Sequence, residues 1–228
     1  EALIQQLDAL ESHFLAMDQP ERKSYFYQIR DRYNEQMLEF DYELYNDEWI
    51  ERATYLIFLN KTCYNGLFRQ NQQAEFNVPY GRYVNPTICD AENLRAVHAA
   101  LHDTTIICDT FTAASDYVDD ETFVYFDPPY RPLNATSSFT GYFKEDFDDE
   151  SQRALAAFYS ALDQRDAWLL LSNSDPQNED PDDTFFDDLY ADFDIERVPA
   201  KRSINSRGDK RGEINELLIR NYSLDDEE

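Results

Sequence analysis

The sequence predicts an α/β fold, with a sheet in the second part of the chain and a mainly helical first part. Apolar residues recur at helical spacing through residues 1–90, whereas short apolar segments alternate with helical ones from residue 91 onward. The chain has 228 residues, of which 42% are hydrophobic, so it can bury a core in one or two domains. This composition is that of a globular protein.

The first part should contain packed helices followed by a hairpin loop. Apolar side chains recur there every three or four positions, and Pro20 separates two such series. The series are Leu3, Leu7, Leu10 and Phe14, and then Tyr25, Ile29, Tyr33 and Met37. A further helix is expected over residues 47–59. The turn signals Asn65-Gly66 and Pro79-Tyr80-Gly81 follow it, so residues 60–83 should form the hairpin loop.

Four strands are expected in the second part, over residues 104–108, 122–126, 168–171 and 214–220, with helices over 91–101 and 151–162. Polar residues follow the first three strands. They are Asp109-Thr110-Phe111, Asp127-Pro128-Pro129-Tyr130 and Ser172-Asn173. Because open α/β sheets bind ligands just beyond the carboxyl ends of their strands, these three segments should converge on one edge and form the site.

The charge of the chain bears on its partners. A formal net charge of −27 taken alone argues against binding a polyanion. The basic residues are concentrated, however: residues 197–211 hold six Lys and Arg against one acid, and residues 61–82 hold three against one. We expect these stretches to face a polyanion while the acidic residues coat other faces. Such an excess of carboxylates resembles proteins from salt-accumulating organisms.

No metal, disulfide or membrane segment is predicted. Cys63, Cys89 and Cys108 lack Cys-x-x-Cys spacing, and we interpret them as reduced core thiols. His98 and His102 lie four apart on an expected helix and could bind a metal, but no carboxylate or Cys spacing supports that, so we interpret them as a solvated helix face. Without an apolar run of membrane-spanning length or a secretory signal, a cytoplasmic protein is expected.

The tetrapeptide Asp127-Pro128-Pro129-Tyr130 is the most specific signal in the chain. An adenine amino group is a poor nucleophile, so a methylating enzyme must hold both N–H bonds and turn the lone pair toward the methyl donor. The Asp127 carboxylate can accept one N–H and the Pro128 carbonyl the other, because two proline rings fix φ and lack competing N–H groups. Tyr130 offers a face on which the base can stack. Out of context, the motif is equally typical of a tight turn after a strand.

Several segments together resemble the Dam type of DNA adenine methyltransferases, the alpha group, in which the target-recognition region precedes this tetrapeptide. The matching segments are Phe-Leu-Asn-Lys (58–61), Tyr-Asn-Gly-Leu-Phe-Arg (64–69), Glu-Phe-Asn-Val-Pro-Tyr-Gly-Arg-Tyr (75–83), the tetrapeptide, Leu-Ser-Asn (171–173) and Arg-Ser-Ile-Asn (202–205). The resemblance implies a helical target-recognition domain carrying a hairpin over residues 1–90. It implies a Rossmann-like methyltransferase sheet over residues 91–228.

The resemblance also implies how double-stranded DNA is read, at GATC sites. Tyr64 would be a base-stacking wedge, Asn65 a contact near the vacated adenine, and Arg69 a reader of guanine. Leu67 and Pro79 would touch the thymine methyl group, as is usual in the major groove. The remaining expected DNA contacts are Asn77, Arg82, Lys201 and Arg202. The target adenine must rotate out of the stack, at a cost of about a few kcal/mol.

Alternatives stay open for several of these residues. Ordinary packing would also explain Tyr64, Leu67 and Pro79, and Arg69 and Arg82 could contact phosphates, which position a protein without specifying a sequence.

The implied cofactor is S-adenosylmethionine, contacted by Asp127, Thr110 and Phe111. For Phe111, simple burial at a strand end is an alternative.

The sequence departs from the family at its start. Family members begin with a short Lys-containing segment and a Phe-x-Gly-x-Gly loop that help hold the cofactor, and none of the five glycines here is spaced as such a loop. We therefore expect an N-terminally truncated adenine methyltransferase. One alternative is a catalytically inactive DNA-binding fragment, which cofactor binding measured by calorimetry would distinguish. Another is an enzyme whose target amino group lies on RNA or on a protein glutamine. The oligomeric state is not predicted.

Overall fold

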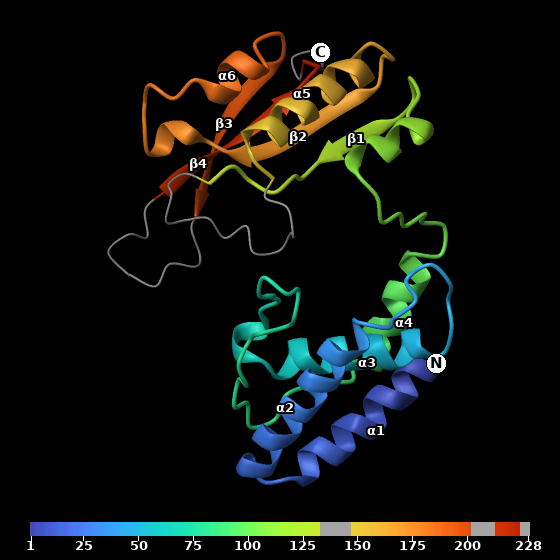
Figure 1. Cartoon of the computed structure of the whole chain (residues 1–228). Coiled ribbons are helices and arrows are strands. Elements are labelled where there is room, and N and C mark those ends of the chain that lie inside the picture. Colours follow the sequence, from blue (N-terminus) through green and yellow to red (C-terminus); the bar gives the residue numbers. More distant parts are fainter. Residues whose placement is uncertain (133–146, 202–212, 224–228) are drawn as a thin grey trace. The chain divides into compact units, whose positions relative to one another are not determined.

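The computed structural model of the chain describes residues 1–132, 147–201 and 213–223. It consists of two compact units, Glu1–Ile106 and Ile107–Glu228, called here the N-terminal and C-terminal units (Figure 1). The assignment of a recognition domain and a catalytic domain to the chain stays a prediction. None of the helices in the described part of the chain is both long and apolar enough to cross a membrane.

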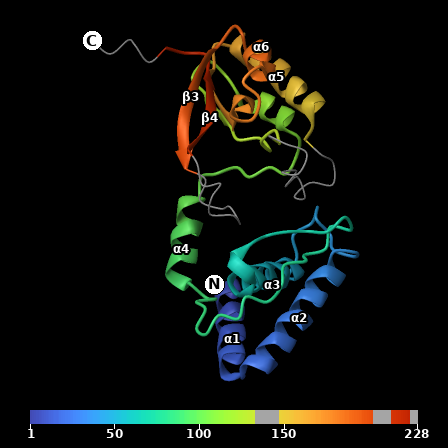
Figure 2. The same cartoon turned by 90° about the vertical axis from the view of Figure 1, so that its left-hand side faces the viewer.

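The N-terminal unit is built on the helices α1 (Ala2–Ala16), α2 (Gln19–Gln36) and α3 (Glu48–Thr62), with α4 (Ala91–Ala100) after a long loop. Figures 1 and 2 both show α1, α2 and α3 packed against one another. Most of the predicted apolar series lies in their common core, where Leu7 and Phe14 are fully buried, but Met37 is not part of it. Phe26, next to the predicted Tyr25, and Phe58 are fully buried there as well. Pro20 lies in the first turn of α2, where its missing N–H group leaves no helical hydrogen bond unmade.

A buried arginine joins the helices to the loop that follows them. The Arg22 side chain is 8% exposed and lies over the Phe14 ring. Its guanidinium donates to four backbone carbonyls, those of Phe14 (3.1 Å), Leu15 (2.7 Å), Met17 (3.0 Å) and Val84 (2.8 Å). The first three end α1, where the last carbonyls of a helix have no partner within the helix. Arg22 therefore caps α1 and fixes the loop at Val84.

The C-terminal unit contains one mixed sheet in the order β1-β2-β4-β3. Its strands are β1 (Phe123–Phe126), β2 (Trp168–Ser174), β3 (Asp194–Lys201) and β4 (Glu213–Arg220). β1 and β2 are parallel, and the other two pairs are antiparallel. The helix α5 (Asp149–Asp163) connects β1 to β2 and lies across the sheet (Figure 1), with Leu155, Tyr159 and Leu162 buried against it. The short helices η2 (Phe111–Tyr117), η3 (Pro176–Asn178) and α6 (Phe185–Leu189) complete the unit.

The predicted α/β class is confirmed, but one strand prediction was wrong and one strand was missed. Residues 104–108 form no strand, and Ile106 in their middle is 75% exposed. An extended segment becomes a strand only when its backbone groups pair with a neighbour, and among the described residues none pairs with this one. The strand β3 was not predicted, because charged residues and Pro199 interrupt its apolar pattern. As an edge strand it tolerates the missing N–H of proline.

The interpretation of all three cysteines as core thiols was also wrong. Cys63 is buried and Cys89 is half-buried, but Cys108 is exposed, because the segment before it joins no sheet. All three are free thiols.

Replacing Arg22 with Met should lower the free energy of unfolding of the N-terminal unit by about 2–4 kcal/mol, because several buried carbonyls lose their donor. Urea unfolding at one fixed salt concentration measures this. Lys23→Met on the exposed face of the same helix is the matched control and should change stability by less than about 0.5 kcal/mol. Equal stability of the two variants would contradict the capping role.

Candidate functional site

The Asp-Pro-Pro-Tyr motif begins where the ladder between β1 and β2 ends. The last paired residues are Phe126 and Leu171, so Asp127 and Ser172 follow side by side on the two parallel strands. The Ser172 hydroxyl donates to Oδ1 of Asp127 at 3.3 Å and lies 2.9 Å from the Tyr125 hydroxyl. A serine hydroxyl has one proton, so while it donates to Asp127 it must accept the proton of Tyr125. This chain of hydroxyls orients one oxygen of Asp127, and no other described residue bonds to the second oxygen.

A cavity of about 300 Å³ lies at this end of β1. Its wall includes Phe111, Asp127, Pro128 and Leu155, and among the described residues that line it Asp127 alone is charged. The Asp127 side chain is exposed, so a ligand can reach the carboxylate. A mostly apolar cavity with one carboxylate at its mouth suits a flat organic ring with a polar substituent.

Tyr130 lies half-buried beyond the two prolines. Burial raises the pKa of its phenol above the ordinary value, and the nearby Ser172 hydroxyl acts in the opposite direction. The phenol is therefore neutral at physiological pH, as a stacking surface for a base should be.

The three polar strand ends converge only in part. Those that follow β1 and β2 lie side by side. Residues 109–111 follow no strand, yet Phe111 lines the same cavity as Asp127, packed 5.5 Å from the Phe158 ring. Thr110 is exposed at the start of η2, where its hydroxyl bonds to Thr112, and it does not line the cavity.

The predicted reading loop of the N-terminal unit follows α3. Tyr64 begins the short helix η1 (Tyr64–Gly66), and its N–H donates to the Pro79 carbonyl at 2.8 Å. A bridge between Cys63 and Tyr80 closes the loop, as predicted for a hairpin. The predicted contacts on this loop, Tyr64, Asn65, Leu67, Arg69, Pro79 and Arg82, are all exposed. They are thus accessible to a large ligand and not committed to core packing.

Asn77 holds the Arg69 side chain. Its Oδ1 accepts from Nε of Arg69 at 2.7 Å, and its carbonyl accepts from Nη2 at 3.4 Å. The Asn77 N–H in turn donates to the Arg69 carbonyl at 3.0 Å. Within the described part of the chain, Nη1 of Arg69 has no hydrogen-bond partner, so the outer side of the guanidinium can still donate to a ligand.

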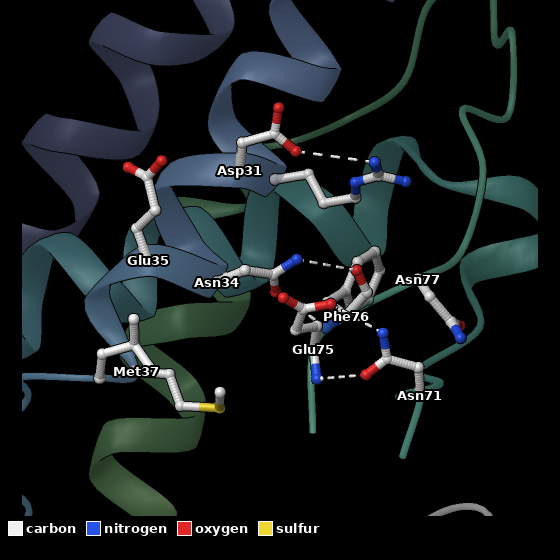
Figure 3. A pocket seen from close by; sticks show the side chains of 10 residues that line it. Asp31, Asn34, Glu35, Met37, Asn71, Glu75, Phe76 and Asn77 are labelled. Atoms are coloured by element: carbon white, nitrogen blue, oxygen red, sulfur yellow. Dashed lines mark hydrogen bonds and ion pairs between the residues drawn. The ribbon is translucent and has the colours of Figure 1, made fainter. Parts of the chain in front are cut away.

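A clamp from α2 fixes the hairpin just before Asn77. The Asn34 amide donates to the Phe76 carbonyl at 3.2 Å, and its oxygen accepts from the Phe76 N–H at 2.8 Å. Figure 3 shows Asn34 and the Asn71–Glu75 contact on the wall of a pocket of about 380 Å³. The Phe76 ring is buried 6.4 Å from Tyr33. The position of Asn77 thus follows from the helical core.

The basic stretch at residues 197–211 differs from the prediction where it is described. The Arg197 guanidinium is paired with Asp175 at 3.1 Å and with Asp187 at 2.8 Å, so it is committed to the C-terminal unit. Arg202 and the side chain of Lys201 lie outside the described residues. His98 and His102 are exposed, and no group of His, Cys, Asp or Glu in the described ranges is arranged to hold a metal ion.

The comparisons with known proteins agree with the geometry of the Asp-Pro-Pro-Tyr motif. The model of the family described as "D12 class N6 adenine-specific DNA methyltransferase" matches residues 1–204 of this chain. The chain belongs to this family of adenine methyltransferases. The predicted resemblance and enzyme class are thereby confirmed, and the mixed sheet with its helices fits the predicted methyltransferase fold.

The relatives of this chain include proteins of an archaeon, of bacteria and of a bacteriophage. The type II methyltransferase M.MjaIII of Methanocaldococcus jannaschii is 51% identical over 221 residues, which are 96% of this chain and 72% of that protein. M1.LlaDCHI of Lactococcus lactis subsp. cremoris is 37% identical over 76% of this chain and 59% of its own length. The DNA adenine methylase of Escherichia coli K12 is 34% identical over 85% of this chain and 63% of its own length. The chain therefore spans somewhat less than two thirds of the last two.

Sequence reasoning did not single out Gln152, which contacts the motif directly. Its amide donates to the Pro129 carbonyl at 3.0 Å, and the residue is fully buried. A signal was available: Gln152, Leu155, Ala156 and Tyr159 share the inward face of α5 at helical spacing. A polar residue on such an apolar face needs a partner, and here the partner is the methyltransferase motif.

The adenine methyltransferase should be sensitive to a side chain at position 81. A Cβ on Gly81 would collide with the Cys63 carbonyl and lie 2.6 Å from the Tyr83 ring. Gly81→Ala should therefore shift the reading loop and destabilise the N-terminal unit by about 1–3 kcal/mol. DNA affinity, measured by fluorescence anisotropy, should fall as well.

Gly66→Ala is the matched control. Its φ of +61° disfavours a side chain, but the nearest atom to a new Cβ is 3.7 Å away. Its cost should be limited to about 1 kcal/mol of backbone strain. A larger loss of stability at position 66 than at position 81 would contradict the steric argument.

Proposed function

We propose that this protein transfers a methyl group from S-adenosylmethionine to the exocyclic amino nitrogen of adenine in duplex DNA. The observation that carries the proposal is the placement of Asp127 at the carboxyl end of β1, exposed at a cavity. Ser172 orients one of its oxygens, and the other has no partner among residues 1–132, 147–201 and 213–223, so we assign it to a ligand. Family membership supports the reaction class.

The residues at the cavity fit the proposed cofactor in part. Phe111 offers an aromatic wall for an adenine ring, and Asp127 offers an acceptor for polar hydrogens. The volume of about 300 Å³ is at the small end of ligand pockets, so we assign to these residues contacts with only part of the cofactor. When bound, S-adenosylmethionine supplies an activated methyl group on a sulfonium ion.

Residues of this chain would prepare the amino group. The free oxygen of Asp127 accepts one N–H of the adenine, and the carbonyl of Pro128 accepts the other. Both bonds draw electron density onto the nitrogen and direct its lone pair away from the ring. Tyr130 provides a neutral face for the flipped base, which must leave the duplex because no paired base can enter a cavity.

The proposed target sequence is GATC, read by the exposed loop after α3. Tyr64, Asn65 and Leu67 are accessible there, and Arg69 is held by Asn77 with the outer side of its guanidinium free to pair with guanine. Pro79 would touch a thymine methyl group. Arg82 and Lys61 are exposed in the same stretch and would draw in the DNA backbone despite the overall acidity.

Replacing Asp127 with Ala should abolish methyl transfer but leave DNA binding within about threefold, because the carboxylate acts only on the flipped base. Asp127→Asn should keep a small residual rate, since an amide oxygen still accepts one bond. Transfer of labelled methyl groups and DNA anisotropy measure the two effects. Asp192→Ala, an exposed carboxylate elsewhere in the unit, is the control. An Asp127→Ala protein with the wild-type rate would refute the assignment.

Two failures of the wild-type protein have different meanings. Binding of DNA without any binding of S-adenosylmethionine in calorimetry would identify an inactive DNA-binding fragment instead of an enzyme. A protein that bound neither DNA nor S-adenosylmethionine would contradict both the methyltransferase assignment and the DNA-binding alternative.

Replacing Arg69 with Ala should reduce discrimination at one base pair by about 1–3 kcal/mol while retaining transfer to other sequences. Asn77→Ala should reduce this discrimination by a smaller amount, because Arg69 keeps its charge but loses the hydrogen bond from its Nε to the Asn77 side chain. Methylation of GATC and of its single-base variants measures this. Arg95→Ala is the matched control, an exposed arginine on α4 paired with Glu1. Equal losses on every duplex for Arg69→Ala would indicate a phosphate contact.

A further inference from the structure

The second half of the Asp-Pro-Pro-Tyr motif cannot be fixed by the backbone hydrogen bonds that fix a strand in a sheet. Pro128 and Pro129 have no N–H groups, so neither can donate to β2. The paired register of β1 and β2 accordingly ends at Phe126. Proline rings fix φ, but the peptide groups on both sides of Tyr130 can still rotate. A site that requires a fixed stacking face and a fixed Pro128 carbonyl needs another restraint there.

Two buried amides supply that restraint. The Gln152 amide, on α5, donates to the Pro129 carbonyl at 3.0 Å. Its oxygen accepts from Nδ2 of Asn173 at 3.2 Å. Oδ1 of Asn173 then accepts from the Arg131 N–H at 3.0 Å and from the Ser174 N–H at 2.9 Å. Both side chains are 0% exposed.

The restrained groups flank a single residue. The Pro129 carbonyl belongs to the peptide before Tyr130, and the Arg131 N–H belongs to the peptide after it. Fixing both peptides fixes the direction in which the Tyr130 side chain leaves the backbone. A third bond, from the Ser174 hydroxyl to the Arg131 carbonyl at 2.6 Å, holds the chain as it leaves the motif. The order of donors is determined, because each amide has one donating and one accepting end.

We infer that Gln152 and Asn173 are positioning residues for methyl transfer, which set the orientation of Tyr130 and, through Pro129, of the Pro128 carbonyl. The inference rests on the proposed function. Neither side chain is among the described residues that line the cavity, and both are 0% exposed, so neither presents a surface to the flipped base or to the cofactor. They act through the backbone of the motif.

Stability alone does not explain this arrangement. A core can be stabilised by apolar side chains of the same shape, and a buried glutamine is useful only where a specific polar group requires a partner. Here the required partner is the carbonyl between Pro129 and Tyr130. Other buried polar groups on α5 serve the core instead: the Tyr159 hydroxyl donates to the carbonyls of Leu169 (3.1 Å) and Ile219 (3.3 Å).

The test compares Gln152→Met with Tyr159→Phe in the intact protein. Both variants remove buried hydrogen bonds from one helix, but only the first frees the motif. With saturating S-adenosylmethionine, the single-turnover transfer rate of Gln152→Met should fall on the order of 100-fold, as a misplaced reacting group does. Its Kd for duplex DNA should stay within about threefold. Tyr159→Phe should keep its rate within about twofold even where it lowers Tm equally.

A second readout is the environment of the flipped base. With 2-aminopurine at the target position, Gln152→Met should still raise fluorescence on binding, but with a different quenching from wild type, because Tyr130 no longer stacks in one orientation. Tyr159→Phe should match the wild type. If Gln152→Met does not fold, Ser174→Ala replaces it, with an expected loss of rate of about tenfold at unchanged Kd.

Equal rates for Gln152→Met and wild type would overturn the inference and leave the proposed function intact. Equal losses for Gln152→Met and Tyr159→Phe at equal Tm would also overturn it, since the effect would then be one of stability. A wild-type protein without methyl transfer would overturn the proposed function, and this inference with it.

Discussion

The register between β1 and β2 is the constraint on which the proposed active site depends. Parallel pairing of Phe126 with Leu171 brings the residues that follow both strands to the same edge. Ser172 thereby reaches Asp127, and Asn173 reaches the backbone of Arg131. A shift of one residue would turn these side chains to the opposite faces of the sheet. The geometry of the motif thus depends on the polar end of the neighbouring strand.

Both units use buried or half-buried polar side chains to fix segments that have no regular backbone pairing. Arg22 donates hydrogen bonds to four carbonyls, three at the end of α1 and one at Val84. Asn34 exchanges two hydrogen bonds with the backbone of Phe76, as a neighbouring strand residue would. In the C-terminal unit, Gln152 and Asn173 do the same for the motif. In each case the helical or sheet core provides a rigid support, and one amide or guanidinium transfers that rigidity to a loop.

Much of the fold was predictable because the spacing of apolar residues along a helix or strand indicates which of its faces is buried. The helices α1, α2, α3 and α5 and the strands β1, β2 and β4 follow that rule. It fails for β3, where Pro199 and charged residues are tolerated at a sheet edge, and for residues 104–108, which are apolar but unpaired. The motif residues were identifiable because their chemistry needs particular residue types. Gln152 could be recognised as a polar residue on the apolar face of α5, but its partner could not, and Arg22 gave no signal, because both roles depend on backbone groups that only the folded chain brings near.

The central claim is that Asp127 and Pro128 together hold the amino group of a flipped adenine. The most direct measurement is a crystal structure of the protein with a GATC duplex and a non-reactive analogue of S-adenosylmethionine. The account predicts that the adenine lies outside the helix, stacked on Tyr130, with its amino nitrogen about 2.7–3.2 Å from a carboxylate oxygen of Asp127 and from the Pro128 carbonyl. An adenine that stays paired in the duplex, or an amino group held by other residues, would contradict it.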